Sequence, residues 1–127
     1  MSEGRFGTAI ACIDGRIQQP VTDWLKAHYY LDYVDAVTTP GADKALAEGQ
    51  AELIEHLKAA AAVSVTKHGS TVLAVVGHYD CTVNPVSREE HVEQIRKALQ
   101  VVRFWNLPVT LIGLWVNEEW QVEAVAG

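Results

Sequence analysis

The stretch Thr71-Val72-Leu73-Ala74-Val75-Val76-Gly77 sets the fold of this chain. It is short, rich in β-branched residues, and apolar on both faces that the alternating side chains of a strand present. A strand with one face in water would alternate apolar and polar residues, whereas a continuous apolar run is typical of a parallel sheet covered on both sides. We therefore predict a buried strand at residues 71–77 and a helix-covered sheet around it.

The preceding sequence adds two strands and two helices. In order, we expect a strand at 7–12, a helix at 22–31, a strand at 33–38 and a helix at 44–67. Thr22 and Asp43 can cap the two helices, because their side-chain oxygens accept hydrogen bonds from free amide groups of a first turn. His68-Gly69 would end the longer helix, since glycine readily takes the left-handed conformation found there.

The following sequence adds one helix and a hairpin. Ser87 and Glu90 have the spacing of a capping box, which predicts a helix that runs to about Trp105. Two strands, at 109–116 and 120–125, flank the polar turn Asn117-Glu118-Glu119. Strands that alternate with helices imply parallel pairing and right-handed crossovers, so we expect an α/β fold in one domain, residues 1–127.

Composition limits the kind of protein this can be. The 127 residues fit one domain, and the formal net charge of −6 argues against nucleic acid or an anionic membrane as partner. No apolar run approaches the roughly 20 residues of a membrane span, and the first residues lack the features of a secretory signal. We expect a cytoplasmic protein, in which a cysteine pair more often binds metal or reacts than forms a disulfide.

Three metal-type donors follow the predicted strands. Cys12 and Cys81 are the only cysteines, and His78 comes directly after the strand at 71–77. Parallel strands present their carboxyl ends at one edge of a sheet, so the three side chains would converge if the strands at 7–12 and 71–77 are neighbours. Two thiolates and one imidazole suit Zn²⁺ with one open position. The alternative is a pair of ordinary buried cysteines and a structural histidine.

A charged pair lies next to the first cysteine, in Cys12-Ile13-Asp14-Gly15-Arg16. Alternate side chains of an extended or turning segment share a face, so Cys12, Asp14 and Arg16 can point together. A carboxylate beside a metal can bind it or accept a proton from metal-bound water, and arginine can hold that carboxylate through two hydrogen bonds. The alternative is an ion pair at the surface.

These two segments, CxDxR and the HxxC of Gly77-His78-Tyr79-Asp80-Cys81, resemble the zinc signature of the β-class carbonic anhydrases. The similarity covers most of the chain in outline. Residues 33–41 look like the family's second strand and its turn, and residues 109–125 look like its last two strands. The resemblance implies a mostly parallel sheet of order 2-1-3-4 with an antiparallel fifth edge strand, covered by helices.

By this resemblance Cys12, His78 and Cys81 would be zinc ligands, and Asp14 and Arg16 the catalytic dyad. The implied reaction is reversible hydration of carbon dioxide to bicarbonate by a zinc-bound hydroxide, which Asp14 orients while Arg16 keeps Asp14 off the metal. Asp14 could also become a fourth ligand and close the site. Two alternatives stay open: hydrolysis of carbonyl sulfide or carbon disulfide at the same site, and a zinc-binding protein of this fold without hydrolytic function.

The chain departs from the family pattern in several places. Gly15 stands where the family usually has serine, and Thr82 where it usually has glycine. The family's N-terminal helices are absent from the sequence, and only residues 82–88 remain of the helical segment after HxxC. We still expect a homodimer or higher homo-oligomer, because Trp115 and Trp120 lie on a hairpin at the predicted sheet edge.

Other polar and aromatic residues are weaker candidates for a role at the site. Histidines could transfer protons, although each fits a surface or helix-end position: His28, His56, His68 and His91. Tyrosines could line a pocket, although aromatic packing also accounts for them: Tyr29, Tyr30 and Tyr79.

Overall fold

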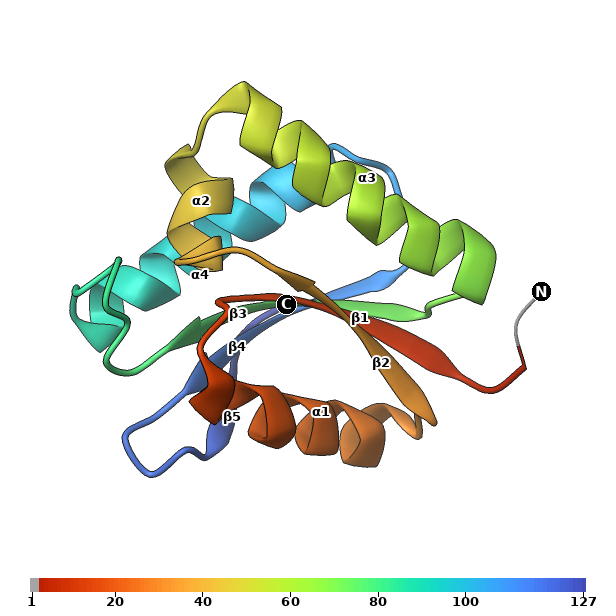
Figure 1. Ribbon diagram of the computed structural model, residues 1–127, viewed down its shortest axis with the longest axis horizontal. Coiled ribbons are helices and arrows are strands. Elements are labelled where there is room, and N and C mark those ends of the chain that lie inside the picture. The colour runs from red at the N-terminus through yellow and green to blue at the C-terminus, as the bar shows by residue number, and fades with distance from the viewer. Residues whose placement is uncertain (1–2) are drawn as a thin grey trace.

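Most of the apolar stretch at residues 71–77 forms β3 (Val72–His78), the central strand of a five-stranded sheet in the computed structural model (Figure 1). The structure describes residues 3–127. The other elements, in chain order, are β1 (Phe6–Ala11), α1 (Gly15–Tyr29), β2 (Tyr33–Thr38), α2 (Ala42–Glu48), α3 (Ala51–His68), α4 (Arg88–Arg103), β4 (Thr110–Val116) and β5 (Val122–Ala126).

The strand order is β2-β1-β3-β4-β5. The first four strands are parallel, and β5 runs antiparallel to β4 at the edge. This confirms the predicted α/β fold, including the order 2-1-3-4 and the antiparallel fifth strand. From β1 the chain winds to β2 on one side and then returns to β3 on the other. The carboxyl ends of β1 and β3 therefore meet where the winding reverses, the place where open α/β sheets bind ligands.

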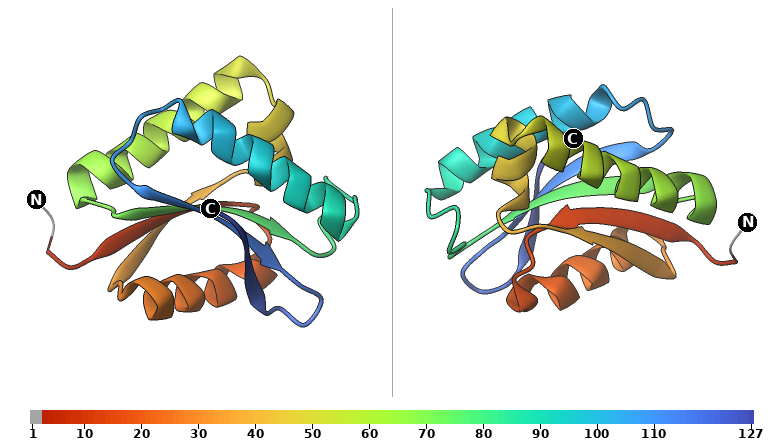
Figure 2. Two further views of the ribbon diagram at one scale, coloured as in Figure 1. Left: turned by 180° about the vertical axis from the view of Figure 1, so that it is seen from behind. Right: turned by 45° about the horizontal axis from the view of Figure 1, so that its top comes forward.

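Helices cover both faces of the sheet. Helix α1 lies on one face, and α2, α3 and α4 lie on the other (Figures 1 and 2). Alternate residues of β3 supply two separate cores: Val72, Ala74 and Val76 pack with α1, whereas Leu73 and Val75 pack with the three helices opposite. All seven residues of β3 are buried, as the apolar run predicts for a strand covered on both sides.

Helix α1 begins at Gly15, seven residues before the start expected at residue 22, so Thr22 is not its N-cap. Asp14 is the cap, and its side chain accepts a hydrogen bond from the backbone N–H of Arg16. Pro20 lies inside the helix and removes one backbone hydrogen bond, a feature that normally argues for a later start. The side chain of Gln18 supports the first turn by donating to the carbonyls of Cys12 and Asp14.

In place of the single helix expected at 44–67, the structure has two helices, α2 and α3, and helix α2 ends at Gly49. A Cβ at this position would lie 2.0 Å from the carbonyl oxygen of Ala45, so only glycine permits the turn. Asp43 is not an N-cap, because it sits within α2 with its side chain buried. Ser87 is confirmed as the N-cap of α4, because its hydroxyl accepts a hydrogen bond from the N–H of Glu90, one of the two bonds of a capping box.

The remaining boundaries agree with those expected to within two residues. Strand β5 starts at Val122, because Trp120 adopts a left-handed backbone conformation that ends the turn rather than beginning a strand. Among the described residues, none of the helices has both the length and the apolar content needed to cross a membrane.

Candidate metal centre

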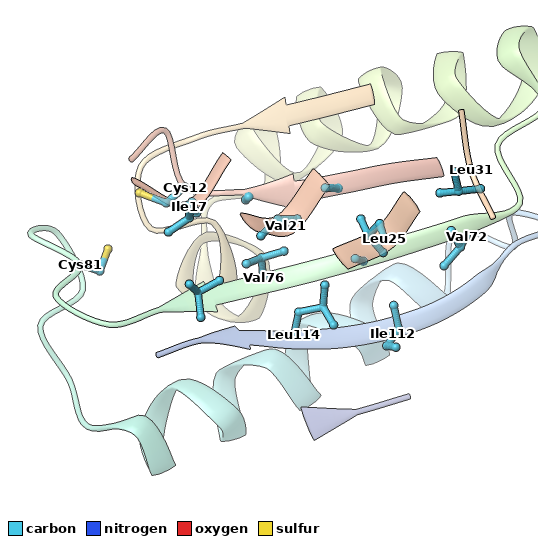
Figure 3. Packing of buried hydrophobic residues seen from close by; sticks show 14 residues of the cluster. Cys12, Ile17, Val21, Leu25, Leu31, Val72, Val76, Cys81, Ile112 and Leu114 are labelled. Atoms are coloured by element: carbon cyan, nitrogen blue, oxygen red, sulfur yellow. The ribbon is translucent and has the colours of Figure 1, made fainter. Parts of the chain in front are cut away.

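The structure brings Cys12, His78 and Cys81 together at the carboxyl ends of β1 and β3. Their sulfur and nitrogen atoms all lie within 4.8 Å of one another, and all three residues are buried. Figure 3 shows both cysteines beyond the ends of these strands, on the side of the core formed by α1. Their positions in the sequence, after two strands expected to be neighbours, predict this convergence.

The imidazole of His78 is oriented for a ligand. Its Nδ1 donates a hydrogen bond of 2.8 Å to the carbonyl oxygen of Tyr79, which fixes the proton on that nitrogen because a carbonyl can only accept. Nε2 then carries the free electron pair. Within residues 3–127, it is also the buried side-chain N or O atom that lacks a hydrogen-bond partner. A buried polar atom without a partner is costly unless something else satisfies it.

The two thiols also favour a bound metal ion. Burial raises the pKa of Cys81, and the neighbouring Cys12 raises it further, because two thiolates so close together repel each other. A divalent cation between them would remove that repulsion and favour both thiolates. Cys12 also accepts a hydrogen bond of 3.4 Å from the backbone N–H of Gly41, an interaction that orients a sulfur ligand.

The donor set therefore fits a metal ion. Two sulfur atoms and one unpartnered, buried imidazole nitrogen match the three protein ligands of a catalytic zinc site, which keeps its fourth position open. Soft thiolates also disfavour magnesium and calcium, which prefer oxygen ligands.

Asp14 and Arg16 lie beside this donor set as a bidentate pair. Arg16 donates from Nη2 to Oδ2 of Asp14 at 2.7 Å and from Nε to Oδ1 at 3.1 Å. The hydrogen bond from Arg16 lowers the pKa of Asp14 to about 2, so the carboxylate is ionised at neutral pH. Oδ2 of Asp14 lies 4.0 Å from Nδ1 of His78. The carboxylate is thus held next to the donor set by Arg16.

A pocket of about 280 Å³ opens onto the cysteines. Its lining consists of Cys12, Ile13, Asp14, Pro40, Cys81, Thr82 and Val83. Ile13 and Val83 are 61% and 52% exposed, so the entrance is largely apolar. A small, uncharged molecule could approach the two cysteines through this opening.

A buried polar network, which the sequence patterns do not predict, lies behind the loop that carries Cys81. Nδ1 of His91 lies 2.6 Å from Oδ2 of Asp43, and both residues are almost fully buried. Asn84 donates to the same carboxyl group at 3.2 Å and to Gln94 at 2.7 Å. Asn84 also donates its backbone N–H to the carbonyl of Cys81. The network therefore joins α2 and α4 to the loop that carries Cys81.

His91 lies in the first turn of α4, as expected for a helix-end residue, but it is not a surface residue, because it pairs with Asp43 inside the protein. The other histidines lie outside the pocket: His28 stacks on Trp24, His56 is exposed on α3, and His68 contacts Asp35. One feature of the sequence could have indicated that His91 is buried. It lies four residues after the cap of an amphipathic helix, next to the buried Val92.

The tyrosines are also placed. Tyr29 and Tyr30 lie at the far end of α1, a helix about 22 Å long that starts beside the donor set. Tyr79 is nearer and packs edge-on against Trp120, with ring centroids 6.4 Å apart. Trp115, expected on an exposed hairpin, is 4% exposed and packs against His91. It therefore covers the body of the domain rather than a partner.

Comparisons with known proteins agree with this description. The β-carbonic anhydrase isoform I of the protozoan Trichomonas vaginalis has the same fold, with a TM-score of 0.61, 14% identity, and coverage of 94% of this chain and 82% of that chain. A carbon disulfide hydrolase, solved in its apo form, gives a TM-score of 0.55, 14% identity, and coverage of 93% and 77%. At this identity the two likenesses show the fold alone.

At the level of sequence, no curated protein matches the chain. The family described as "Putative carbonic anhydrase" does match, over residues 2–126. The match runs through both the CxDxR and the HxxC segments and confirms the resemblance seen in them. Because it spans nearly the whole sequence, the protein belongs to this carbonic anhydrase family.

Proposed function

We propose that the protein is a zinc-dependent enzyme that reversibly hydrates carbon dioxide to bicarbonate. The observation that carries this proposal is the buried Cys12, His78 and Cys81 donor set with an arginine-held carboxylate directly beside it. The first feature suits zinc, and the second supplies the polar group that a hydration reaction needs next to the metal. Family membership and the shared fold support the same reaction class.

Each residue would have a defined task. Cys12, His78 and Cys81 would hold the ion, and a bound zinc would supply Lewis-acid activation of a water molecule. Asp14, ionised and able only to accept hydrogen bonds, would accept one from the attacking water and so orient its lone pair towards the substrate carbon. With a pKa near 2, Asp14 is too weak a base to keep the proton. The proton would therefore pass on to solvent or buffer.

Arg16 would keep Asp14 available for that task. A free carboxylate next to a cation tends to bind it, whereas the two hydrogen bonds from Arg16 occupy both carboxylate oxygens. Lysine could not replace this fork-shaped contact, because an ammonium group is a single point of charge.

A second candidate function is hydrolysis of carbonyl sulfide or carbon disulfide at the same site. The apolar pocket entrance favours it, since Ile13, Pro40 and Val83 suit a neutral, weakly hydrated molecule better than a bicarbonate ion. The structural similarity to a carbon disulfide hydrolase also supports this candidate. Both candidates use the same donor set, so the substrate must be decided by assay.

Stopped-flow hydration of carbon dioxide by zinc-loaded protein tests the proposal, with carbonyl sulfide and carbon disulfide assayed in parallel. Arg16→Ala should keep one zinc per chain yet lose nearly all activity, because Asp14 would become free to bind the metal. Arg96→Ala, an exposed arginine on α4, is the control and should behave like the parent protein. Full activity in Arg16→Ala would refute the role of the dyad, and inactivity of the parent on all three substrates would favour a non-hydrolytic zinc protein.

We also propose a homo-oligomer, most simply a homodimer. Support now comes from the apolar rim of the pocket, where Ile13 and Val83 are exposed, rather than from the buried Trp115. Exposed apolar patches of this kind commonly mark contacts between proteins. Light scattering across micromolar concentrations should show a dimer, and a monomer at the highest concentration would contradict the proposal.

We further propose a cytoplasmic location. Both cysteines are free thiols in the structure, and thiols persist best in a reducing compartment. Fractionation of cells that produce a tagged protein should recover it in the cytosolic fraction, whereas recovery from an oxidising compartment would refute this.

A further inference from the structure

We propose that Asp80 and Trp120 act as positioning residues that clamp Arg16 against Asp14. The inference rests on the proposed function, in which Arg16 keeps Asp14 away from the metal. It extends that function to two residues outside the CxDxR and Cys-His-Cys sets, one in the HxxC loop and one in the β4–β5 hairpin.

The clamp consists of contacts on three sides of the Arg16 guanidinium. Asp14 takes one edge through two hydrogen bonds. Asp80 takes another, accepting from Nη1 at its Oδ2 and from Nη2 at its backbone carbonyl, both at 3.2 Å. The ring of Trp120 covers a face of the group, with its centroid 4.6 Å from Cζ. That distance is within the range of a cation–π interaction.

Backbone strain occurs at both clamp residues. Asp80 and Trp120 have φ angles of 59° and 58°, the left-handed region that residues with a side chain rarely adopt. Such conformations persist only where surrounding structure enforces them, and they concentrate at functional sites. Here each one directs a side chain to the same guanidinium, although the two residues belong to loops 40 positions apart in the sequence.

The hairpin that presents Trp120 is well supported. The side chain of Asn117 accepts hydrogen bonds from the backbone N–H groups of Glu119 and Gln121, and its backbone N–H donates to the carbonyl of Gln121. Trp120 itself donates its N–H to the carbonyl of Asn117. Tyr79 packs against the indole ring and adds a contact from the loop that carries Asp80. The indole is therefore held in place independently of Arg16.

Arg16 needs such support because its side chain is 45% exposed. The ion pair between an exposed arginine and a single carboxylate contributes little stabilising free energy, so such an arginine moves between rotamers. Contacts from two additional loops limit that freedom, so the bidentate pair with Asp14 is maintained. Loss of the clamp would let Arg16 leave and Asp14 turn towards the metal donors, which would shift the site from open to closed.

Two measurements test the clamp, one of which needs no metal. Nuclear magnetic resonance of the Arg16 Nε–H group reports its position, because Cζ lies 4.6 Å from the centroid of the indole ring and the ring current should shift this proton upfield. In metal-free protein, Trp120→Leu should abolish that upfield shift, Trp120→Phe should keep part of it, and Asp80→Asn should broaden the signal as Arg16 becomes mobile. Glu119→Gln, which removes one charge from the same hairpin, is the control and should leave the signal unchanged.

The second measurement uses protein loaded with Co²⁺, whose visible spectrum reports the fourth ligand. Asp14→Ala gives the reference spectrum for a site without the carboxylate, and Arg16→Ala gives the reference for the closed site. Relative to the parent, we expect the closed-to-open ratio to rise about threefold in Asp80→Asn or Trp120→Leu, and about tenfold in the double variant, from the usual strength of exposed ion-pair and cation–π contacts.

An unchanged Arg16 signal in both Trp120→Leu and Asp80→Asn would overturn the clamp. So would a parent-like cobalt spectrum in the double variant when the two reference spectra differ. If no variant binds cobalt, the proposed function fails, but the resonance of Arg16 still decides whether the clamp exists. If cobalt binds and the clamp variants shift the spectrum while no substrate is turned over, the clamp stands and the proposed reaction is wrong.

Discussion

Replacing His91 by leucine should destabilise the protein strongly, although His91 lies outside the donor set. The side chain is 1% exposed, and its Nδ1 is the 2.6 Å partner of Oδ2 of Asp43. In the variant this carboxyl oxygen would stay buried between α2 and α4 without a partner. Oδ1 would keep its hydrogen bonds from the backbone N–H of Lys44 and from Asn84.

The expected cost follows from these contacts. A buried oxygen left without a partner costs about 1–3 kcal/mol, and removing one member of a buried acid–base pair costs about 3–5 kcal/mol. Because Oδ1 remains satisfied, we place His91→Leu between the two, at about 3 kcal/mol. A domain of this size has roughly 5–15 kcal/mol of stability, so the variant should still fold. The urea midpoint should fall by roughly 1–2 M.

Equilibrium urea unfolding at fixed zinc concentration, followed by circular dichroism, measures the effect. His56→Leu is a matched control, since His56 is exposed on α3 and its loss should change stability by less than about 0.5 kcal/mol. In a double-mutant cycle, Asp43→Asn should cost less in the His91→Leu background than alone, by about 1 kcal/mol or more. Additive effects, or a His91→Leu cost below about 1 kcal/mol, would refute the pairing.

Three further predictions follow from the site. Cys81→Ser and His78→Ala should lose zinc by elemental analysis and melt at lower temperature, because metal binding is coupled to folding; retained metal with an unchanged melting temperature would count against the donor set. Gly15→Ala should stabilise the protein by about 0.4–1 kcal/mol in thermal unfolding, since a Cβ there meets no atom within 4 Å, and a loss of stability would be the contrary result. The hydrogen bond from Arg16 lowers the pKa of Asp14 from 3.8 to about 2. The pairing therefore stabilises the fold at pH values above the ordinary pKa of 3.8, and this stabilisation is lost as the pH falls through about 2. In metal-free protein, Asp14→Asn should therefore flatten the fall in melting temperature over that window, and an unchanged profile would argue against the pair.

The fold was predictable because its signals are local. Strand β3 is apolar on both faces, strands alternate with helices, and a turn separates β4 from β5. Local signals leave the order of strands undetermined, and here the order 2-1-3-4 came from the resemblance to a family. The register that brings β1 beside β3, with Thr8 opposite Leu73, depends on packing between residues far apart in the chain.

The errors arose where one local signal opposed another. Pro20 lies inside α1, where proline ordinarily disfavours a helix, but the Asp14 cap and the Gln18 side chain support the first turn. Helical periodicity continued through Gly49, although the close carbonyl of Ala45 ends α2 there. In both cases the sequence contained the relevant residue, but its effect depended on backbone geometry.

Some residues of the candidate site could likewise be predicted from the sequence, and others could not. The candidate metal ligands could be predicted because all three lie at or just beyond the carboxyl ends of β1 and β3, and Asp14 and Arg16 because they share a turn with Cys12. Asp80 and Trp120 could not, since their contacts with Arg16 depend on left-handed turns and on how two distant loops meet. Sequence spacing identifies residues that carry chemistry more readily than residues that position them.

The end of β3 explains how the metal donors and the buried network are joined. A Cβ on Gly77 would lie 2.6 Å from Oδ2 of Asp43 and 3.3 Å from Nδ1 of His91, so the absent side chain makes room for that pair on the face covered by α2 and α4. The next residue, His78, points to the opposite face because strand side chains alternate, and it joins Cys12 and Cys81 there. A shift of one residue in this strand would place the imidazole among the helices and glycine at the metal donors. The order Gly77-His78 therefore fixes both the support and the donor set, since neither can form on the other face.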